Sequence, residues 1–167
     1  MLSRDLVIDA CAVINLIRGN VARQCLTAIE PRPSVTPAIR SECENKSATP
    51  MSLKDLFEHQ CLHCLDEVLT SDEVVAFMEK HDLGAGESEG ILVCLALKKH
   101  FWSDDRRARE RAIELLTRAA VIGTAGMLRE LVKSGDITRD QTIGAYRTMR
   151  ELGGYQPNFP DGFFDNA

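Results

Sequence analysis

Residues 6–16 read Leu-Val-Ile-Asp-Ala-Cys-Ala-Val-Ile-Asn-Leu, which is an apolar run, an acid and then a second, mostly apolar stretch. The run from Leu6 to Asp9 predicts a short buried strand. The residues after it predict a helix that ends near Gly19. Asp9 is therefore expected at the carboxyl end of a strand, where open α/β sheets bind their ligands.

The same alternation of short apolar runs and helical stretches continues along the chain. Further extended segments are predicted at 35–37, 60–65, 100–103 and 119–122. Helices are predicted over 21–29, from Pro37, from Ser52, and over 71–80, 87–99, 105–117, 124–135 and 138–153. This pattern is typical of an α/β fold with right-handed crossovers. We expect a three-layer α/β/α sandwich around a central, mainly parallel sheet of four to five short strands, with one domain at 1–153 and a C-terminal tail at 154–167.

Several predicted helix starts carry residues that are typical of helix N-termini. Thr36 is expected as an N-cap, with Pro37 at the first helical position. Ser71-Asp72-Glu73 and Thr124 are expected to cap the helices that begin there. The polar segment 45–50 predicts a loop.

Composition limits the classes of function. The chain has 167 residues, of which 44% are hydrophobic and 27% charged, as in an ordinary globular domain. Its net charge of −5 argues against binding polyanions by overall charge, because such binding requires an excess of Lys and Arg. A nucleic-acid substrate remains compatible with this charge if divalent cations change the local field.

The N-terminal sequence, the hydropathy and the cysteines together predict a cytoplasmic protein. The N-terminus has no secretory pattern, and no stretch approaches the length of a membrane span. The six cysteines lie in apolar or helical patterns, which is typical of a reduced, cytoplasmic protein. Cys61-Leu62-His63-Cys64 looks like half of a zinc site, but a closed site needs four ligands. We expect buried thiols there.

Four acids fall at predicted strand ends or helix starts. They are Asp9, Glu87, Asp104 and Asp105. Carboxylates that gather without basic partners are costly unless a cation neutralises them. Oxygen ligands from separate elements suit Mg²⁺ or Mn²⁺. Such a metal activates water and polarises a phosphoryl oxygen, so the pattern predicts phosphodiester hydrolysis.

Five segments, taken in order, resemble PIN-domain proteins. They are residues 6–16, 35–42 (Val-Thr-Pro-Ala-Ile-Arg-Ser-Glu), 83–89 (Leu-Gly-Ala-Gly-Glu-Ser-Glu), 103–109 (Ser-Asp-Asp-Arg-Arg-Ala-Arg) and 123–128 (Gly-Thr-Ala-Gly-Met-Leu). The resemblance covers nearly the whole chain to about Gly153. It implies a metal-dependent ribonuclease with an RNA substrate, and many similar bacterial and archaeal proteins are toxins silenced by a small antitoxin protein. A homodimer is also common among them.

The resemblance also implies roles for individual residues. Asp9, Glu42, Glu87 and Asp105 would be catalytic, and the metal ligands would come from Asp9, Glu87, Asp104 and Asp105. We favour Asp105 as the ligand, with Asp104 as a helix-capping or outer-sphere residue. At position 11 the family often has a small hydrogen-bonding residue, and here that residue is Cys11.

Other polar residues near these segments have two interpretations each. Asn15 and Thr124 are candidates for contact with metal-bound water or substrate, and Thr124 is equally an N-cap. The arginines that follow the last acids are candidates for RNA phosphate contacts or for a solvated helix face: Arg106, Arg107 and Arg109. Glu89 is expected to be solvated or secondary.

Two other functions compete with the nuclease. A catalytically degenerate PIN-like module would bind RNA or protein without cutting. A phosphohydrolase that forms an aspartyl-phosphate would need a second Asp two residues after Asp9, and that position is Cys11.

Overall fold

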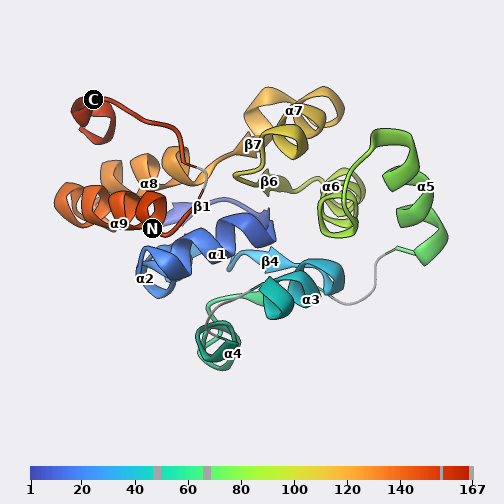
Figure 1. Cartoon of the computed structure of the whole chain (residues 1–167), viewed down its shortest axis with the longest axis horizontal. Coiled ribbons are helices and arrows are strands. Elements are labelled where there is room, and N and C mark those ends of the chain that lie inside the picture. The colour runs from blue at the N-terminus through green and yellow to red at the C-terminus, as the bar shows by residue number, and fades with distance from the viewer. Residues whose placement is uncertain (47–49, 66–68, 155, 166–167) are drawn as a thin grey trace.

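The computed structural model describes residues 1–46, 50–65, 69–154 and 156–165. A five-stranded parallel sheet lies at its centre (Figure 1). Its strand order is β5-β4-β2-β6-β7. The strands are β2 (Leu6–Ile8), β4 (Ser34–Val35), β5 (His63–Cys64), β6 (His100–Trp102) and β7 (Val121–Ile122). In register, Ile8 pairs with Trp102, and Trp102 pairs with Ile122. The predicted parallel sheet of short strands is confirmed.

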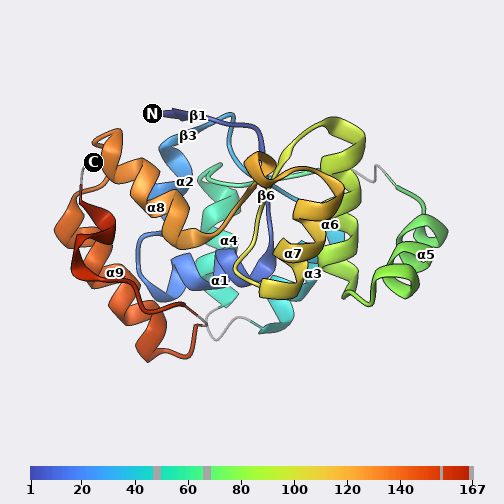
Figure 2. The same cartoon turned by 90° about the horizontal axis from the view of Figure 1, so that it is seen from above.

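Helices cover both faces of this sheet, as expected for three layers (Figures 1 and 2). One side holds α1 (Ala10–Arg18), α2 (Ala22–Thr27), α8 (Thr124–Lys133) and α9 (Arg139–Glu151); the other holds α3 (Pro37–Lys46) and α6 (Ala85–Leu97). The remaining α-helices are α4 (Pro50–Glu58), α5 (Ser71–His81) and α7 (Arg106–Leu115).

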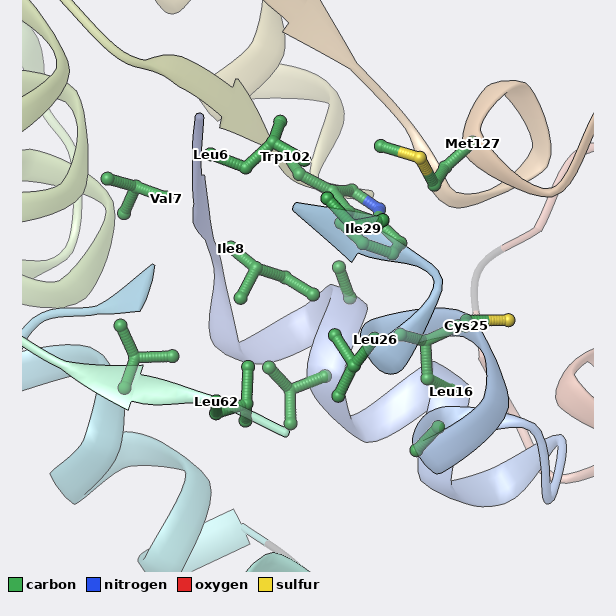
Figure 3. Packing of buried hydrophobic residues seen from close by; sticks show 14 of the residues in the cluster. Leu6, Val7, Ile8, Leu16, Cys25, Leu26, Ile29, Leu62, Trp102 and Met127 are labelled. Carbon is green, nitrogen blue, oxygen red and sulfur yellow. The ribbon is translucent and has the colours of Figure 1, made fainter. Parts of the chain in front are cut away.

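Side-chain alternation along the strands explains the two layers, because successive strand residues point to opposite faces. Figure 3 shows Ile8 and Trp102 on the same side as Leu26 of α2 and Met127 of α8. Val7 points the other way. On its face, α6 approaches the sheet closely at Gly90, where a Cβ atom would lie 3.0 Å from Phe101 and 3.7 Å from Val7. Glycine at this position therefore permits the close contact between helix and sheet.

A second, two-stranded parallel sheet was not predicted. It pairs β1 (Leu2–Ser3) with β3 (Ile29–Glu30). The helix expected over 21–29 ends at Thr27, and Ile29 is instead a fully buried strand residue. Pairing with the distant N-terminus decides this conformation, and a local pattern does not contain that information.

Most helix starts agree with the sequence signals. Thr36 Oγ1 accepts a hydrogen bond from the Ile39 amide, and Pro37 is the first residue of α3, as predicted. Thr70, rather than Ser71, caps α5 through a capping box with Glu73. The predicted loop at 45–50 begins later than expected because α3 continues to Lys46, and residues 47–49 lie outside the described residues.

The C-terminal tail packs on α8 and α9 (Figure 2). Phe159 and Phe163 stack with ring centroids 3.9 Å apart, and the Arg129 guanidinium lies over Phe163. Tyr146 donates a hydrogen bond to the Pro157 carbonyl at 2.7 Å. The tail therefore contributes its own aromatic cluster to this side of the molecule.

None of the cysteines that the structure describes forms a disulfide, and Cys61, which was predicted to be buried, is 1% exposed. Cys64 is only half-buried, because it lies on the edge strand β5. Among the helices that the structure describes, none has the length and apolar character needed to cross a membrane.

The contact at Gly90 generates a stability prediction. Gly90→Val is expected to lower the free energy of unfolding by about 1–3 kcal/mol, because the new side chain must displace Phe101 and Ile39. Gly144→Val is the matched control, since no atom lies within 4 Å of the added Cβ; its effect should stay within about 0.5 kcal/mol. Urea denaturation measures both, and equal effects at the two positions would contradict the described packing.

Candidate active site

The site lies where β2 and β6 end. The Asp9 amide donates a hydrogen bond to the Trp102 carbonyl at 2.8 Å, and the Ser103 amide donates to the Ile122 carbonyl at 3.1 Å. Because the strands are parallel, the residues that follow them meet at one edge of the sheet. Asp9 and the Ser103–Asp105 segment are therefore brought together, as the sequence predicted.

Asp9 is buried, with 2% of its surface exposed, and each of its oxygens is hydrogen-bonded. Oδ1 accepts from the Ala10 amide at 2.8 Å, which caps α1. Oδ2 accepts from Cys11 Sγ at 2.9 Å and from Ser103 Oγ at 2.8 Å. Burial raises the pKa of Asp9 to about 6; these hydrogen bonds oppose the shift, and the negative charges of Glu87 and Glu42 add to it.

Cys11 holds Asp9 through its thiol. Burial and the nearby carboxylates of Asp9 and Asp104 raise the pKa of its thiol, so the sulfur keeps its proton and acts as a donor. The same sulfur accepts a hydrogen bond from the Asp104 amide at 3.2 Å. Ser103, which also holds Asp9, was not singled out from the sequence, although a polar residue directly after a buried strand is a usable signal.

Asp104 is also buried, but neutral groups surround its carboxylate. Oδ1 accepts from the Thr124 amide at 2.7 Å. Oδ2 accepts from Asn15 Nδ2 and from Gln156 Nε2, both at 2.7 Å. The predicted site residue Asn15 thus reaches an acid of the site. Gln156 could not be predicted, because a single polar residue in the tail carries no local signal.

The expected role of Thr124 as an N-cap needs correction, whereas Asp104 does cap a helix. The N-cap of α8 is Gly123, which has no side chain, and Thr124 is the first helical residue. Asp104 supplies the missing acceptor by binding the Thr124 amide, so it caps α8 rather than α7. The Thr124 hydroxyl accepts a hydrogen bond from Trp102 Nε1 at 3.1 Å.

Asp105 caps α7 and is partly exposed. Its Oδ1 accepts from the Ala108 amide at 2.8 Å, and its own amide donates to Ser103 Oγ at 3.1 Å. Its negative charge helps to raise the pKa of Glu87. Asp105 thus interacts electrostatically with another acid of the site.

Glu87 and Glu42 come from the opposite helical layer. Glu87 is the third residue of α6, and its Oε2 accepts from the Gly84 amide at 3.0 Å. Burial raises its pKa, with further contributions from the charges of Asp105 and Glu42. A Cβ atom on Gly86 would lie 2.6 Å from Glu42 Oε2, so glycine lets α3 bring this carboxylate against α6.

Glu89 and the arginines differ in part from expectation. Glu89 is half-buried, and its Oε2 accepts from the Ala38 amide at 2.9 Å, which caps α3. Arg106 pairs with Glu110, and Arg107 pairs with Asp82. Arg109 lies against Gly123, where a Cβ would be 2.6 Å from its Nη1.

A pocket of about 450 Å³ opens beside these acids; its lining includes Cys11, Asn15, Glu42, Asp104, Asp105 and Arg106. A larger hollow of about 910 Å³ includes Asp5, Glu30, Arg32 and Lys99 in its lining. There, Lys99 pairs with Asp5 and Arg32 with Glu30, so these opposite charges neutralise each other. The smaller pocket is the better candidate site because it lies at the ends of β2 and β6, where Asp104 and Asp105 accept hydrogen bonds from neutral groups.

The acidic side chains near the pocket are of the chemical type that binds a hard cation. Asp9, Glu42, Glu87 and Asp105 offer carboxylate oxygens, which Mg²⁺ and Mn²⁺ prefer. Within the described ranges, however, no three His, Cys, Asp or Glu side chains are placed to share one ion. In each of Asp9, Glu87 and Asp105, one carboxylate oxygen accepts a hydrogen bond from a backbone amide near a helix start. Assignment of individual ligands therefore remains a prediction.

The buried charge of Asp9 predicts a pH dependence of stability. Its folded pKa of about 6 exceeds the ordinary value of 3.8, so the folded state binds the proton more tightly and loses stability as the pH rises through about 6. At about 1.4 kcal/mol per pKa unit, Asp9→Asn should gain roughly 2.4 kcal/mol relative to wild type between pH 4 and pH 7.5, because the unfolded carboxyl is already partly ionised at pH 4. Urea denaturation in EDTA at a series of pH values tests this, and parallel curves for the two proteins would contradict it.

The contact between the tail and Asp104 predicts a second stability effect. Gln156→Ala removes a hydrogen bond to a buried carboxylate and is expected to cost about 1.5–3 kcal/mol. Gln156→Glu keeps the shape but adds a like charge, so it should cost more. Asn158→Ala, which removes only an exposed contact with Arg150, should change stability by less than about 0.5 kcal/mol. Equal unfolding free energies for the Gln156 and Asn158 variants would disprove the role of this contact.

Comparison with known protein families finds a match, whereas no curated protein and no solved structure matches. The matching family is DUF3368, a PIN domain, and the match covers residues 5–157. These limits include β2, every acid discussed above and Gln156. The chain therefore belongs to the PIN-domain family, as its sequence segments suggested.

Proposed function

We propose that this protein is a Mg²⁺- or Mn²⁺-dependent endoribonuclease that hydrolyses phosphodiester bonds. A PIN domain has a nuclease-type fold, which makes phosphodiester chemistry the natural starting point. The observation that carries the proposal is the group of acids at the end of the parallel sheet. Among the described side chains, no Lys or Arg forms an ion pair with Asp9, Glu87 or Asp105, and burial raises the pKa of the first two.

In this proposal Asp9, Glu42, Glu87 and Asp105 would hold the cation. When bound, the cation would supply an activated water and would polarise the phosphoryl group. Cys11 and Ser103 orient Asp9 through their hydrogen bonds. Asp104 holds α1, α8 and the tail around the pocket through Asn15, Thr124 and Gln156. Arg106 and Arg109, near the pocket and the start of α8, would contact RNA phosphates.

The biological setting is proposed from the resemblance among sequences. A toxin of this type would act on cytoplasmic RNA and would be silenced by a small antitoxin protein, and it would form a homodimer with a self-complementary interface. The net charge of −5 supports a selective substrate rather than broad binding of nucleic acids.

A second candidate function is a PIN-like module that binds RNA or protein without cutting. The observation that favours it is the spread of the acids, since no three of the described candidate ligands converge on one point. The two functions differ in a measurable way, because only the nuclease requires metal for turnover.

Cleavage of single-stranded and structured RNAs, with Mn²⁺ and with EDTA, tests the proposal. Asp9→Asn and Asp105→Asn are each expected to reduce the Mn²⁺-dependent rate by at least about 100-fold, because each removes a charged oxygen ligand. Titration calorimetry should show weaker Mn²⁺ binding in both variants. Asp104→Asn should mainly reduce stability and leave more of the Mn²⁺ affinity, because neutral donors surround that carboxylate.

The matched control is Asp72→Asn, which changes an exposed acid in the first turn of α5. Cleavage that survives in both site variants would indicate a contaminating nuclease. RNA binding without cleavage by the wild type would instead select the binding module.

A further inference from the structure

One face of α1 runs from the acids to the rim of the pocket. Cys11, Ile14, Asn15 and Arg18 are spaced by three, one and three residues, so they share a face of the helix. All four line the 450 Å³ pocket. The first and third of them contact Asp9 and Asp104, whereas Arg18 lies about 10 Å farther along the helix axis than Cys11.

Arg18 is a half-buried cation whose guanidinium makes no hydrogen bond or ion pair with any described residue. The neighbouring arginine of the pocket, Arg106, is held by Glu110. A position in the last turn of α1 is electrostatically favourable for a cation, but this leaves the five N–H donors of the guanidinium unused. The pocket thus has an available donor group at the end opposite its acids.

We propose that Arg18 binds a phosphate of single-stranded RNA that neighbours the phosphate to be cut. This inference rests on the proposed function and names the substrate contact for the same pocket. The acids repel the RNA backbone, so a cation at a distance along the strand is needed to hold it. A planar guanidinium matches a phosphate with two parallel hydrogen bonds, which a point charge cannot provide.

The size and lining of the rest of the pocket fit single-stranded RNA rather than a duplex. Its volume of about 450 Å³ is that of a small-molecule site, which excludes a duplex from the interior. The wall at the end of α9 is Gly153-Gly154, which presents no side chain to the strand. Gly154 packs so closely on α1 that a Cβ would lie 2.4 Å from Asn15 Oδ1. Half-buried Ile14 adds an apolar surface for a ribose or base.

The test measures binding of a short, labelled, mixed-sequence single-stranded RNA in the Asp9→Asn background, which is chosen to keep the RNA intact. Arg18→Gln should raise Kd about tenfold and should reduce the slope of log Kd against log salt by about 0.7, the value for one phosphate contact on a single strand. Arg18→Lys should keep the slope. Arg4→Gln is the matched control: it removes the same charge next to the opposite end of β2, and both quantities should stay unchanged.

The outcomes separate this inference from the nuclease proposal. Equal Kd and slope for Arg18→Gln and Arg4→Gln would overturn the role of Arg18, even if the wild type cuts RNA. An Arg18-dependent slope without Mn²⁺-dependent cleavage by the wild type would support the contact and overturn the nuclease. Protein that neither binds nor cuts RNA would overturn both. In the wild-type background, a rise in KM with kcat changed less than about twofold would also support a binding role.

Discussion

The parallel pairing of β2 with β6 is the constraint on which the candidate site depends. It sets the Asp9 amide against the Trp102 carbonyl, and this register brings the Ser103 hydroxyl within 2.8 Å of the Asp9 carboxylate. A shift of one residue would turn every side chain of β2 to the other face of the sheet. The buried layers on both faces forbid that shift, so the hydrophobic core fixes the position of the polar site at the ends of these strands.

Two neighbouring acids at this edge, Asp104 and Asp9, are stabilised in different ways. The carboxylate of Asp104 is surrounded by an amide N–H and two carboxamides, which satisfy its oxygens. Asp9 has comparable hydrogen bonds but also faces the charges of Glu42 and Glu87, and burial raises its pKa. Perturbed acids in a pocket are a recognised sign of function, whereas a fully satisfied buried acid is a sign of architecture. The structure thus distinguishes an acid whose oxygens are satisfied by neutral donors from an acid with a raised pKa at the same edge of the sheet.

Much of the arrangement could be predicted because it follows from local patterns. The run Leu6–Ile8 followed by Asp9, and the turn before Glu87, each place an acid at the end of an element. What could not be predicted depends on contacts between distant segments. Ile29 becomes a strand residue only because it pairs with Leu2. Gly123 needs a cap from Asp104, and Glu89 caps a helix that begins about fifty residues earlier in the chain. No periodicity within a short window contains these pairings.

The contact between Gln156 and Asp104 joins the far end of the chain to the centre of the pocket. The free energy that docks the tail, through Tyr146 and the phenylalanine cluster, therefore also favours the ordered position of Asp104. Linkage of this kind acts equally in both directions. A molecule that binds the ordered pocket must strengthen attachment of the tail, and a molecule that captures the tail must weaken the pocket by the same free energy. Binding at the C-terminal tail and binding at the pocket are therefore thermodynamically coupled.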